Sequence, residues 1–244
     1  MEILVCAVIA LAAYLLGSIP AGYLAGRARG IDIRTVGSGN IGATNAFRIL
    51  GKTAGTIVLV ADGLKGWAAV SLVPGIIARL FAWQLGRDEA EYLGIVAGIA
   101  VILGHNYTCW LKFKGGKGVA TSAGVLAALV PVAFVVSLLT WIVVCWLTRY
   151  VSVASIVSAV VLPFATWLAH YGGILICITA LMSALAIYKH KGNIARLMNG
   201  TENKVGRKNQ RWRERVFLGV RTAICFADNM RCAHRMRWIV KKYR

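Results

Sequence analysis

Residues 118–148 read GVATSAGVLAALVPVAFVVSLLTWIVVCWLT, a run of 31 residues without a single Lys, Arg, Asp or Glu. One helix of that length would be about 46 Å long, whereas the hydrocarbon core of a bilayer is roughly 30 Å thick. Pro131 lies near the middle of the run and lacks the N–H that a helix interior requires. The run therefore predicts two short membrane helices that meet at Pro131.

Five other apolar segments flank this run, and the charged residues lie between them. The segments are 3–25, 54–78, 92–110, 151–169 and 172–188. The chain of 244 residues is 58% hydrophobic and 15% charged, whereas about a quarter of the residues of a soluble domain are charged. We predict an all-α integral membrane protein of about seven transmembrane helices. Five spans are the alternative, with a re-entrant 118–148 segment and one further block on the membrane surface.

The basic residues predict the orientation. Loop 26–53 carries five Lys or Arg against one Asp, and turn 111–117 carries three Lys and no acid. Loop 79–91 instead carries two Arg against three acids. Because Lys and Arg concentrate in cytoplasmic loops, we expect the first two loops in the cytoplasm and the third outside. The N-terminus is then outside and the C-terminus cytoplasmic.

Residues 205–244 form a separate basic tail. From Lys189 to Arg244 there are sixteen Lys or Arg against three acids, which gives +13 of the chain's net charge of +19. Apolar residues of the tail recur at roughly helical spacing, so one interpretation is a basic amphipathic helix on the inner leaflet. A solvated tail is the other. In either case we expect contact with anionic membrane lipid and not with nucleic acid.

The first polar loop contains the sequence GSGNIGATNAFR at residues 37–48. Small residues let the backbone approach a ligand and present N–H groups to an anion, and an arginine can hold a phosphate through two bonds. An ordinary turn needs two or three such residues, so a run of twelve indicates a binding loop. Its candidate ligands are Ser38, Asn40, Thr44, Asn45 and Arg48.

The second polar loop contains KFKGGKGVAT at residues 112–121 and leads directly into an apolar helix. Free N–H groups at the start of a helix favour an anion there. Lysines that only anchor a span would explain the charge but not the glycines, and the spacing differs from that of a P-loop. The candidate phosphate ligands are Lys112, Gly115, Gly116, Lys117 and Gly118.

Other polar residues are less informative by themselves. His190 and Asn193 are three residues apart and can share one face of a helix, although a single His at the end of a span is commonly interfacial. Asp62 and Lys65 can pair within one turn inside the second apolar segment. Ionisable groups in a span are costly, so this pair has either a structural or a catalytic role.

Together these stretches resemble the PlsY family of bacterial integral membrane acyl-phosphate:glycerol-3-phosphate acyltransferases. The three stretches 37–48, 112–121 and 190–202 are similar to the three signature motifs of that family. Residues 17–23 (GSIPAGY) and 104–107 (GHNY) also match its pattern. The similarity indicates an acyltransferase activity for the membrane-embedded part of the chain.

The resemblance covers residues 1–204, which we take as a transmembrane acyltransferase domain. It implies transfer of an acyl chain from acyl phosphate to the 1-hydroxyl of sn-glycerol 3-phosphate, giving 1-acylglycerol 3-phosphate (lysophosphatidate) and phosphate. That is the first acylation step of phospholipid synthesis. The implied location is the bacterial cytoplasmic (inner) membrane, as a multi-pass protein, with membrane lipid and the soluble enzyme that makes acyl phosphate as partners.

The resemblance also implies roles for individual residues. Ser38, His190 and Asn193 are the catalytic candidates, and Glu202 joins the substrate ligands. Glycerol 3-phosphate is assigned to Arg48 and Lys112, with His190 and Asn193 nearby. Acyl phosphate is assigned to the Gly115–Gly118 backbone, Lys117, Ser38 and Thr44. Because acyl phosphate is an activated mixed anhydride, we expect no cofactor, and the six scattered cysteines indicate no metal site.

Two questions stay open at the level of sequence. The proton of the attacking hydroxyl goes either to His190 or to a phosphate oxygen of the donor, and we favour the donor phosphate, with His190 positioning the acceptor and Ser38 donating to the oxyanion. An anion permease or lipid scramblase, or a membrane anchor, are the other classes of protein. Polar clusters at span ends favour the enzyme, since transporters interrupt their spans near mid-membrane.

Overall fold

The structure is a computed structural model that describes residues 2–84 and 86–206. Every regular element in those ranges is helical, which confirms the all-α prediction. The elements are α1 (Glu2–Ser18), α2 (Ala21–Arg27), α3 (Ala43–Ile49), α4 (Lys52–Ser71), α5 (Val73–Leu80), α6 (Arg87–Asn106), the 3-10 helix η1 (Cys109–Leu111), α7 (Val119–Leu129), α8 (Pro131–Thr148), α9 (Val151–Leu168), α10 (Gly173–Lys189) and α11 (Lys191–Met198). The predicted amphipathic helix of the tail lies outside the described residues.

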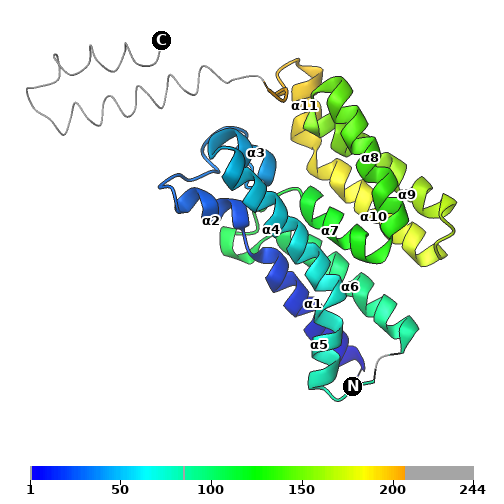
Figure 1. Ribbon diagram of the computed structural model, residues 1–244. Coiled ribbons are helices and arrows are strands. Elements are labelled where there is room, and N and C mark those ends of the chain that lie inside the picture. Colours follow the sequence, from blue (N-terminus) through cyan, green and yellow to red (C-terminus); the bar gives the residue numbers. More distant parts are fainter. Residues whose placement is uncertain (1, 85, 207–244) are drawn as a thin grey trace, which may run out of the picture. The chain divides into compact units, whose positions relative to one another are not determined.

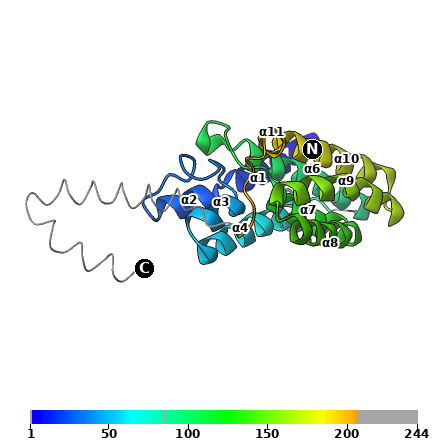
Figure 2. The same cartoon turned by 90° about the horizontal axis from the view of Figure 1, so that it is seen from above.

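Two groups of long helices lie side by side in the part of the chain up to Val205, which forms one compact unit (Figures 1 and 2). α1, α4, α5 and α6 make up one group, and α8, α9 and α10 make up the other. α7 packs along α4 and also contacts α6 and α8. The second loop, which directly precedes α7, is therefore held where the two groups meet.

Glycines allow the helices of the first group to approach closely. A Cβ at Gly17 of α1 would lie 2.1 Å from the carbonyl oxygen of Val101 in α6. A Cβ at Gly124 of α7 would lie 1.9 Å from the carbonyl oxygen of Gly63 in α4. Close packing of this kind drives helix association in a membrane, where lipid is as apolar as a leucine side chain.

The outer surface of the helices is strongly apolar. Ile3, Leu64, Trp146 and Leu147 are all more than half exposed. Four helical segments of the described residues are long and apolar enough to cross a membrane: Glu2–Arg27, Arg87–Leu111, Pro131–Thr148 and Val151–Leu168. The count rises to six if each of the bent pairs α4–α5 and α10–α11 is one span, and α7 is a further, shorter apolar helix. These features are those of a multi-pass membrane protein.

The long apolar run divides as predicted, because α7 ends at Leu129 and α8 begins at Pro131. The two parts are unequal, with 11 and 18 residues, because Pro131 lies closer to the start of the run than to its end. Two further breaks were not expected from the sequence. The first span is interrupted at Pro20 and the second bends by 43° before Pro74, because proline cannot donate the backbone hydrogen bond.

The connections gather at two opposite ends of the helices (Figure 1). The start of α1, the α5–α6 connection and the α9–α10 connection lie at one end. Residues 28–51, which include α3, and residues 107–118, 149–150 and 190–205 lie at the other, which we call the loop end. A hydrogen bond of 2.7 Å from the Val205 N–H to the Arg149 carbonyl oxygen joins the segment after α11 to the α8–α9 connection. All three motifs of the sequence are therefore brought together there.

Candidate active site

Asn45 holds the first loop in shape. It is 1% exposed, in the first turn of α3. Its Oδ1 accepts a hydrogen bond from the Ser38 N–H at 3.0 Å. Its Nδ2 donates to the carbonyl oxygens of Ile33 and Val36, each at 3.1 Å. Because the Asn45 side chain is used in this way, its role within this structure is to fix the path of residues 33–38.

Among the remaining candidates of the first loop, Ser38 and Arg48 are exposed, whereas Asn40 and Thr44 are half-buried. Ser38 lies between Gly37 and Gly39, which both have positive φ, and is exposed. Asn40 accepts the Gly42 N–H through its side-chain Oδ1 at 2.8 Å, which makes a tight turn before α3. Thr44 and Arg48 are four residues apart on α3, so they lie on one face of the helix.

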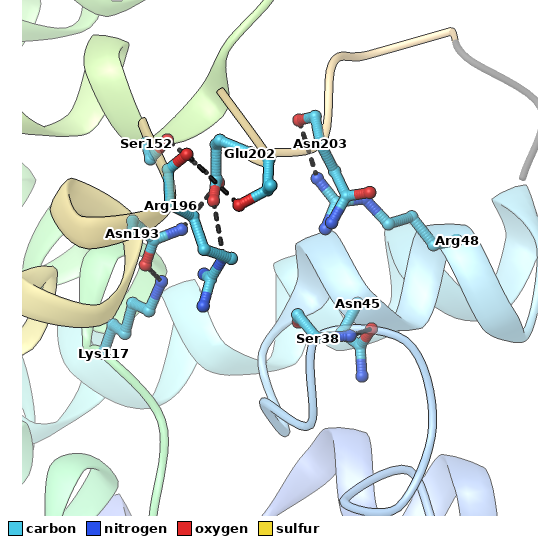
Figure 3. A network of polar contacts seen from close by, with 10 residues as sticks. Ser38, Asn45, Arg48, Lys117, Ser152, Asn193, Arg196, Glu202 and Asn203 are labelled. Carbon is cyan, nitrogen blue, oxygen red and sulfur yellow. Dashed lines mark hydrogen bonds and ion pairs between the residues drawn. The ribbon is translucent and has the colours of Figure 1, made fainter. Parts of the chain in front are cut away.

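Arg48 reaches the third motif. Its guanidinium donates to the Asn203 carbonyl oxygen at 3.4 Å (Figure 3). The first motif and the end of the third, 155 residues apart in the sequence, are thereby neighbours at the loop end. The resulting arrangement places a cation of the first loop beside the polar residues that follow α11.

The second loop lies on the end of α6. The Gly115 N–H donates to the Asn106 carbonyl oxygen at 3.2 Å and the Gly116 N–H to the His105 carbonyl oxygen at 3.0 Å. These two backbone donors are thus already engaged. Gly118 is the N-cap of α7. The first N–H groups of α7 have no acceptor within the helix.

Lys117 and Lys112 differ in their surroundings. Lys117 is half-buried, and its Nζ donates to Asn193 Oδ1. Lys112 is exposed, in a left-handed conformation with φ 54°, at the end of the 3-10 helix. Among the polar contacts found in residues 2–84 and 86–206, none involves the Lys112 side chain. The structure therefore brings Lys117, but not Lys112, into the polar network.

Glu202 is the centre of that network (Figure 3). Its Oε1 accepts from Asn193 Nδ2 at 2.7 Å and from Ser152 Oγ at 3.0 Å. Its Oε2 accepts from Arg196 Nε at 2.7 Å. Ser152 of α9 and Asn193 and Arg196 of α11 thus converge on one carboxylate, and Lys117 of the second loop joins them through Asn193. Such a network fixes each side chain more firmly than a single contact would.

His190 lies at the bend of 53° between α10 and α11 and is buried. Its Nδ1 is 2.8 Å from the Ala186 carbonyl oxygen. Since a carbonyl oxygen only accepts, Nδ1 carries the proton and Nε2 is left with a lone pair. Burial, assisted by the charge of Lys117, lowers the pKa of His190 to about 4. The ring is therefore neutral at pH 7, with Nε2 as a hydrogen-bond acceptor.

Positive charge exceeds negative charge at the loop end. Burial, together with the charges of Arg196 and Arg48 and against the effect of Glu202, lowers the pKa of Lys117 to about 8. Burial acts to raise the pKa of Glu202, but the hydrogen bonds from Asn193 and Arg196 outweigh it and leave the pKa below its usual value. Three cations thus surround one ionised carboxylate, and an added phosphate group would relieve their mutual repulsion.

Sequence reasoning missed two members of the network. Ser152 is one serine in an apolar span, and its partner Glu202 is 50 residues away, so no local pattern indicates its role. Arg196 follows Asn193 by three residues on α11, and that spacing was a usable signal. Ser38, Arg48, Lys117, His190, Asn193 and Glu202 were selected from the sequence and lie at the loop end.

Comparison with known proteins decides the family. The family model described as "Glycerol-3-phosphate acyltransferase" matches residues 7–200. The chain belongs to this family. Among its curated relatives, the glycerol-3-phosphate acyltransferase of Geotalea daltonii is 46% identical over 196 residues, covering 80% of this chain and 95% of the relative. That of Clostridioides difficile is 43% identical over 211 residues, covering 86% of this chain and all of the relative.

Solved structures agree with this family assignment. PlsY, an integral membrane glycerol 3-phosphate acyltransferase, is similar in its glycerol 3-phosphate form, with a TM-score of 0.73 and 37% identity over 82% of this chain and 96% of that one. Its lysophosphatidic acid form gives a TM-score of 0.71 and 36% identity, over 82% and 95%. The resemblance to the PlsY family is confirmed, and the chain is a multi-pass membrane acyltransferase of this family.

Proposed function

We propose that this glycerol-3-phosphate acyltransferase uses acyl phosphate as its donor, and that it makes 1-acylglycerol 3-phosphate and phosphate as the first acylation of phospholipid synthesis. The observation that carries the proposal is the set of three cations, Arg48, Lys117 and Arg196, around Glu202 at the loop end. Two phosphorylated substrates have to meet beside a membrane-embedded acyl chain. A cationic site at the end of apolar helices suits both requirements.

Glycerol 3-phosphate is assigned to Arg48, with His190 and Asn193 beside it. A guanidinium can hold a phosphate through two bonds, which fixes the orientation of the acceptor. Lys112, at the exposed rim, would attract the incoming phosphate as a point charge. The solved PlsY structures are described as glycerol 3-phosphate and lysophosphatidic acid forms, which supports the same acceptor and the same class of product here.

Acyl phosphate is assigned to Lys117, Gly118 and the first turn of α7, with Ser38 and Thr44 on the facing loop. Gly115 and Gly116 serve this site by shaping the loop, because their N–H groups are bonded to the end of α6. Asn40 and Asn45 likewise hold the first loop. The acyl carbonyl would then lie near Ser38, whose hydroxyl can donate to the oxyanion that develops on attack.

The proton of the attacking hydroxyl is assigned to a phosphate oxygen of the donor. A base with a pKa of about 4, as His190 has, accepts a proton poorly at neutral pH, whereas the second pKa of a phosphate group lies near 6. The lone pair of His190 Nε2 can still accept a hydrogen bond from the hydroxyl. His190 thus positions the acceptor while the departing phosphate takes the proton.

The loop end is assigned to the cytoplasm, with the N-terminus outside and the C-terminus inside. In this proposal there are seven crossings of alternating direction: α1, α4–α5, α6, α7, α8, α9 and α10. α7 is only about 16 Å long, so it crosses part of the core and needs α8 to complete a hairpin. Val132 N–H donates to the Tyr171 hydroxyl at 3.4 Å, which supports a start of α8 level with the α9–α10 connection. Donor made by a soluble bacterial enzyme would reach this side of the inner membrane.

The test is release of phosphate by the purified protein in lipid vesicles, given palmitoyl phosphate with and without glycerol 3-phosphate. We expect release that depends on the acceptor and is lost in Arg48→Ala, with lysophosphatidate formed in equal amount. Lys112→Ala shows whether the rim lysine contributes. If a folded sample releases no phosphate but moves glycerol 3-phosphate across the vesicle membrane, the transport interpretation is right instead.

A further inference from the structure

Three ionisable side chains lie buried between α4 and α6, apart from the network of Figure 3. Asp62, Lys65 and His105 are 2%, 7% and 5% exposed. Asp62 Oδ1 is 2.9 Å from Lys65 Nζ and 3.4 Å from His105 Nδ1. The predicted pairing of Asp62 with Lys65 is confirmed. Ionisable side chains inside a membrane span are costly to bury, so a buried cluster of them indicates a functional role.

The second loop rests on one edge of this cluster. A Cβ at Gly116 would lie 2.1 Å from His105 Nε2, and a Cβ at Gly115 would lie 2.1 Å from the His105 carbonyl oxygen. Both glycines also donate backbone hydrogen bonds to the His105–Asn106 pair. The orientation of the His105 ring therefore determines how closely the loop can approach α6. The opposite edge of the same ring faces Asp62.

The end of α6 also contacts the third motif and the first helix. The Asn106 carbonyl oxygen accepts from Lys189 Nζ at 3.1 Å, one residue before His190. Lys65 Nζ donates to the Ile19 carbonyl oxygen at 2.9 Å, at the break between α1 and α2. A shift of the cluster would thus reach Lys189, beside His190, and the break between α1 and α2. The Asn106 side chain, 1% exposed, faces Gly118 at the start of α7.

We propose that Asp62 and His105 are positioning residues for phosphate binding by the second loop. Asp62 fixes the plane of the His105 imidazole, and the imidazole supports Gly116, so that Lys117 and Gly118 meet the substrate phosphate in a fixed geometry. Neither residue touches the substrates assigned above. The inference rests on the proposed function, because it names residues that act through the same site.

The experiment uses two variants of the full-length protein in lipid vesicles. The double variant Asp62→Asn/Lys65→Met removes the ion pair as a whole, so that no lone ammonium is left buried. His105→Gln changes the surface beneath the loop. We expect KM for acyl phosphate to rise about tenfold or more in both variants, with kcat changed by less than about threefold. This is the pattern expected when substrate binding energy is lost. Ser137→Ala, a buried serine on α8, is the matched control and should leave both constants unchanged.

A double-mutant cycle separates positioning from a general loss of structure. Gly116→Ala displaces the loop from the same imidazole, so its effect on KM should not add to that of His105→Gln. This cycle also decides the matter if the Asp62→Asn/Lys65→Met protein does not fold. Additive effects, or unchanged KM in folded variants, would overturn the inference. Absence of acceptor-dependent phosphate release by the native protein would instead refute the proposed function.

Discussion

We predict that Lys117 makes substrate binding depend on pH. Its pKa is lowered to about 8, so in the free protein the ammonium loses its proton as the pH rises through about 8. We expect KM for acyl phosphate, the substrate assigned to Lys117, to increase between about pH 7 and pH 9. In Lys117→Arg the guanidinium stays protonated, and the increase should vanish. KM is measured across this range for both proteins. An equal slope in both would show that another group titrates.

Glu202 stabilises the folded chain through bonds to Asn193, Ser152 and Arg196. Its pKa is held below the ordinary 4.5, so its ionised form contributes stability above about pH 4.5 and loses it as the pH falls through the lowered value. Glu202→Gln should reduce stability by about 1–3 kcal/mol at pH 7, as expected for lost charged hydrogen bonds.

The measurement is Tm in detergent at pH 7 and at pH 4. The difference between the native protein and Glu202→Gln should shrink at the lower pH. Asp32→Asn is the control, because Asp32 forms its ion pair with Arg34 in an exposed loop, where pairs contribute little. A Glu202→Gln difference that is the same at both values would mean that the charge is not responsible.

The motifs of the candidate site show what a pattern at the residue level can predict. The Gly-rich loops with Arg48 and Lys117 are predictable because about ten consecutive residues determine both their backbone shape and their charge. Ser152 could not be found, since its hydrogen bond to Glu202 forms only when α9 is placed beside the segment after α11. Asn45 was selected as a ligand, yet its amide is used within its own loop. Sequence shows which residues are polar, and packing decides which way they point.

At the scale of elements, the contact between α4 and α7 determines where the second loop lies. In Gly124→Ala the new Cβ would lie 1.9 Å from the Gly63 carbonyl oxygen and 2.7 Å from the Trp67 nitrogen, so the two helices must separate. We expect a loss of about 1–3 kcal/mol in stability and a higher KM, because α7 begins at the loop.

Gly75→Ala is the matched control for that substitution. No atom lies within 4 Å of a Cβ placed at Gly75 in α5, and alanine favours a helix by up to about 1 kcal/mol. Its stability should be equal or slightly higher, and its activity unchanged. Equal losses of Tm in both variants would argue against the importance of the α4–α7 contact.

Helix breaks were predictable only where length made a break necessary. The run at 118–148 was too long for one crossing, so Pro131 could be identified as its turning point. Pro20 and Pro74 lie in segments of ordinary length, and there the sequence alone allowed a continuous span. The structure shows breaks at both prolines, where the missing N–H removes a backbone hydrogen bond of the helix.

At the scale of the whole molecule, the proposed orientation places one set of connections in the cytoplasm. Lys114 and Asn199 are exposed at the loop end, whereas Gln84 and His170 are exposed in the connections at the opposite end. In a chain whose native cysteines are replaced, a cysteine at Gln84 or His170 should react with a membrane-impermeant maleimide added to intact cells. A cysteine at Lys114 or Asn199 should react only after the membrane is opened.

The same labelling distinguishes seven crossings from five. Val132 follows the turn between α7 and α8 and is 57% exposed. If α7 and α8 form a complete hairpin across the membrane, Val132→Cys reacts from outside, as His170→Cys does. If the 118–148 segment is re-entrant, Val132→Cys stays protected in intact cells because the turn remains within the lipid core. The apolar surroundings of Val132 slow labelling even at the surface, so the comparison with His170→Cys is made at several reagent concentrations.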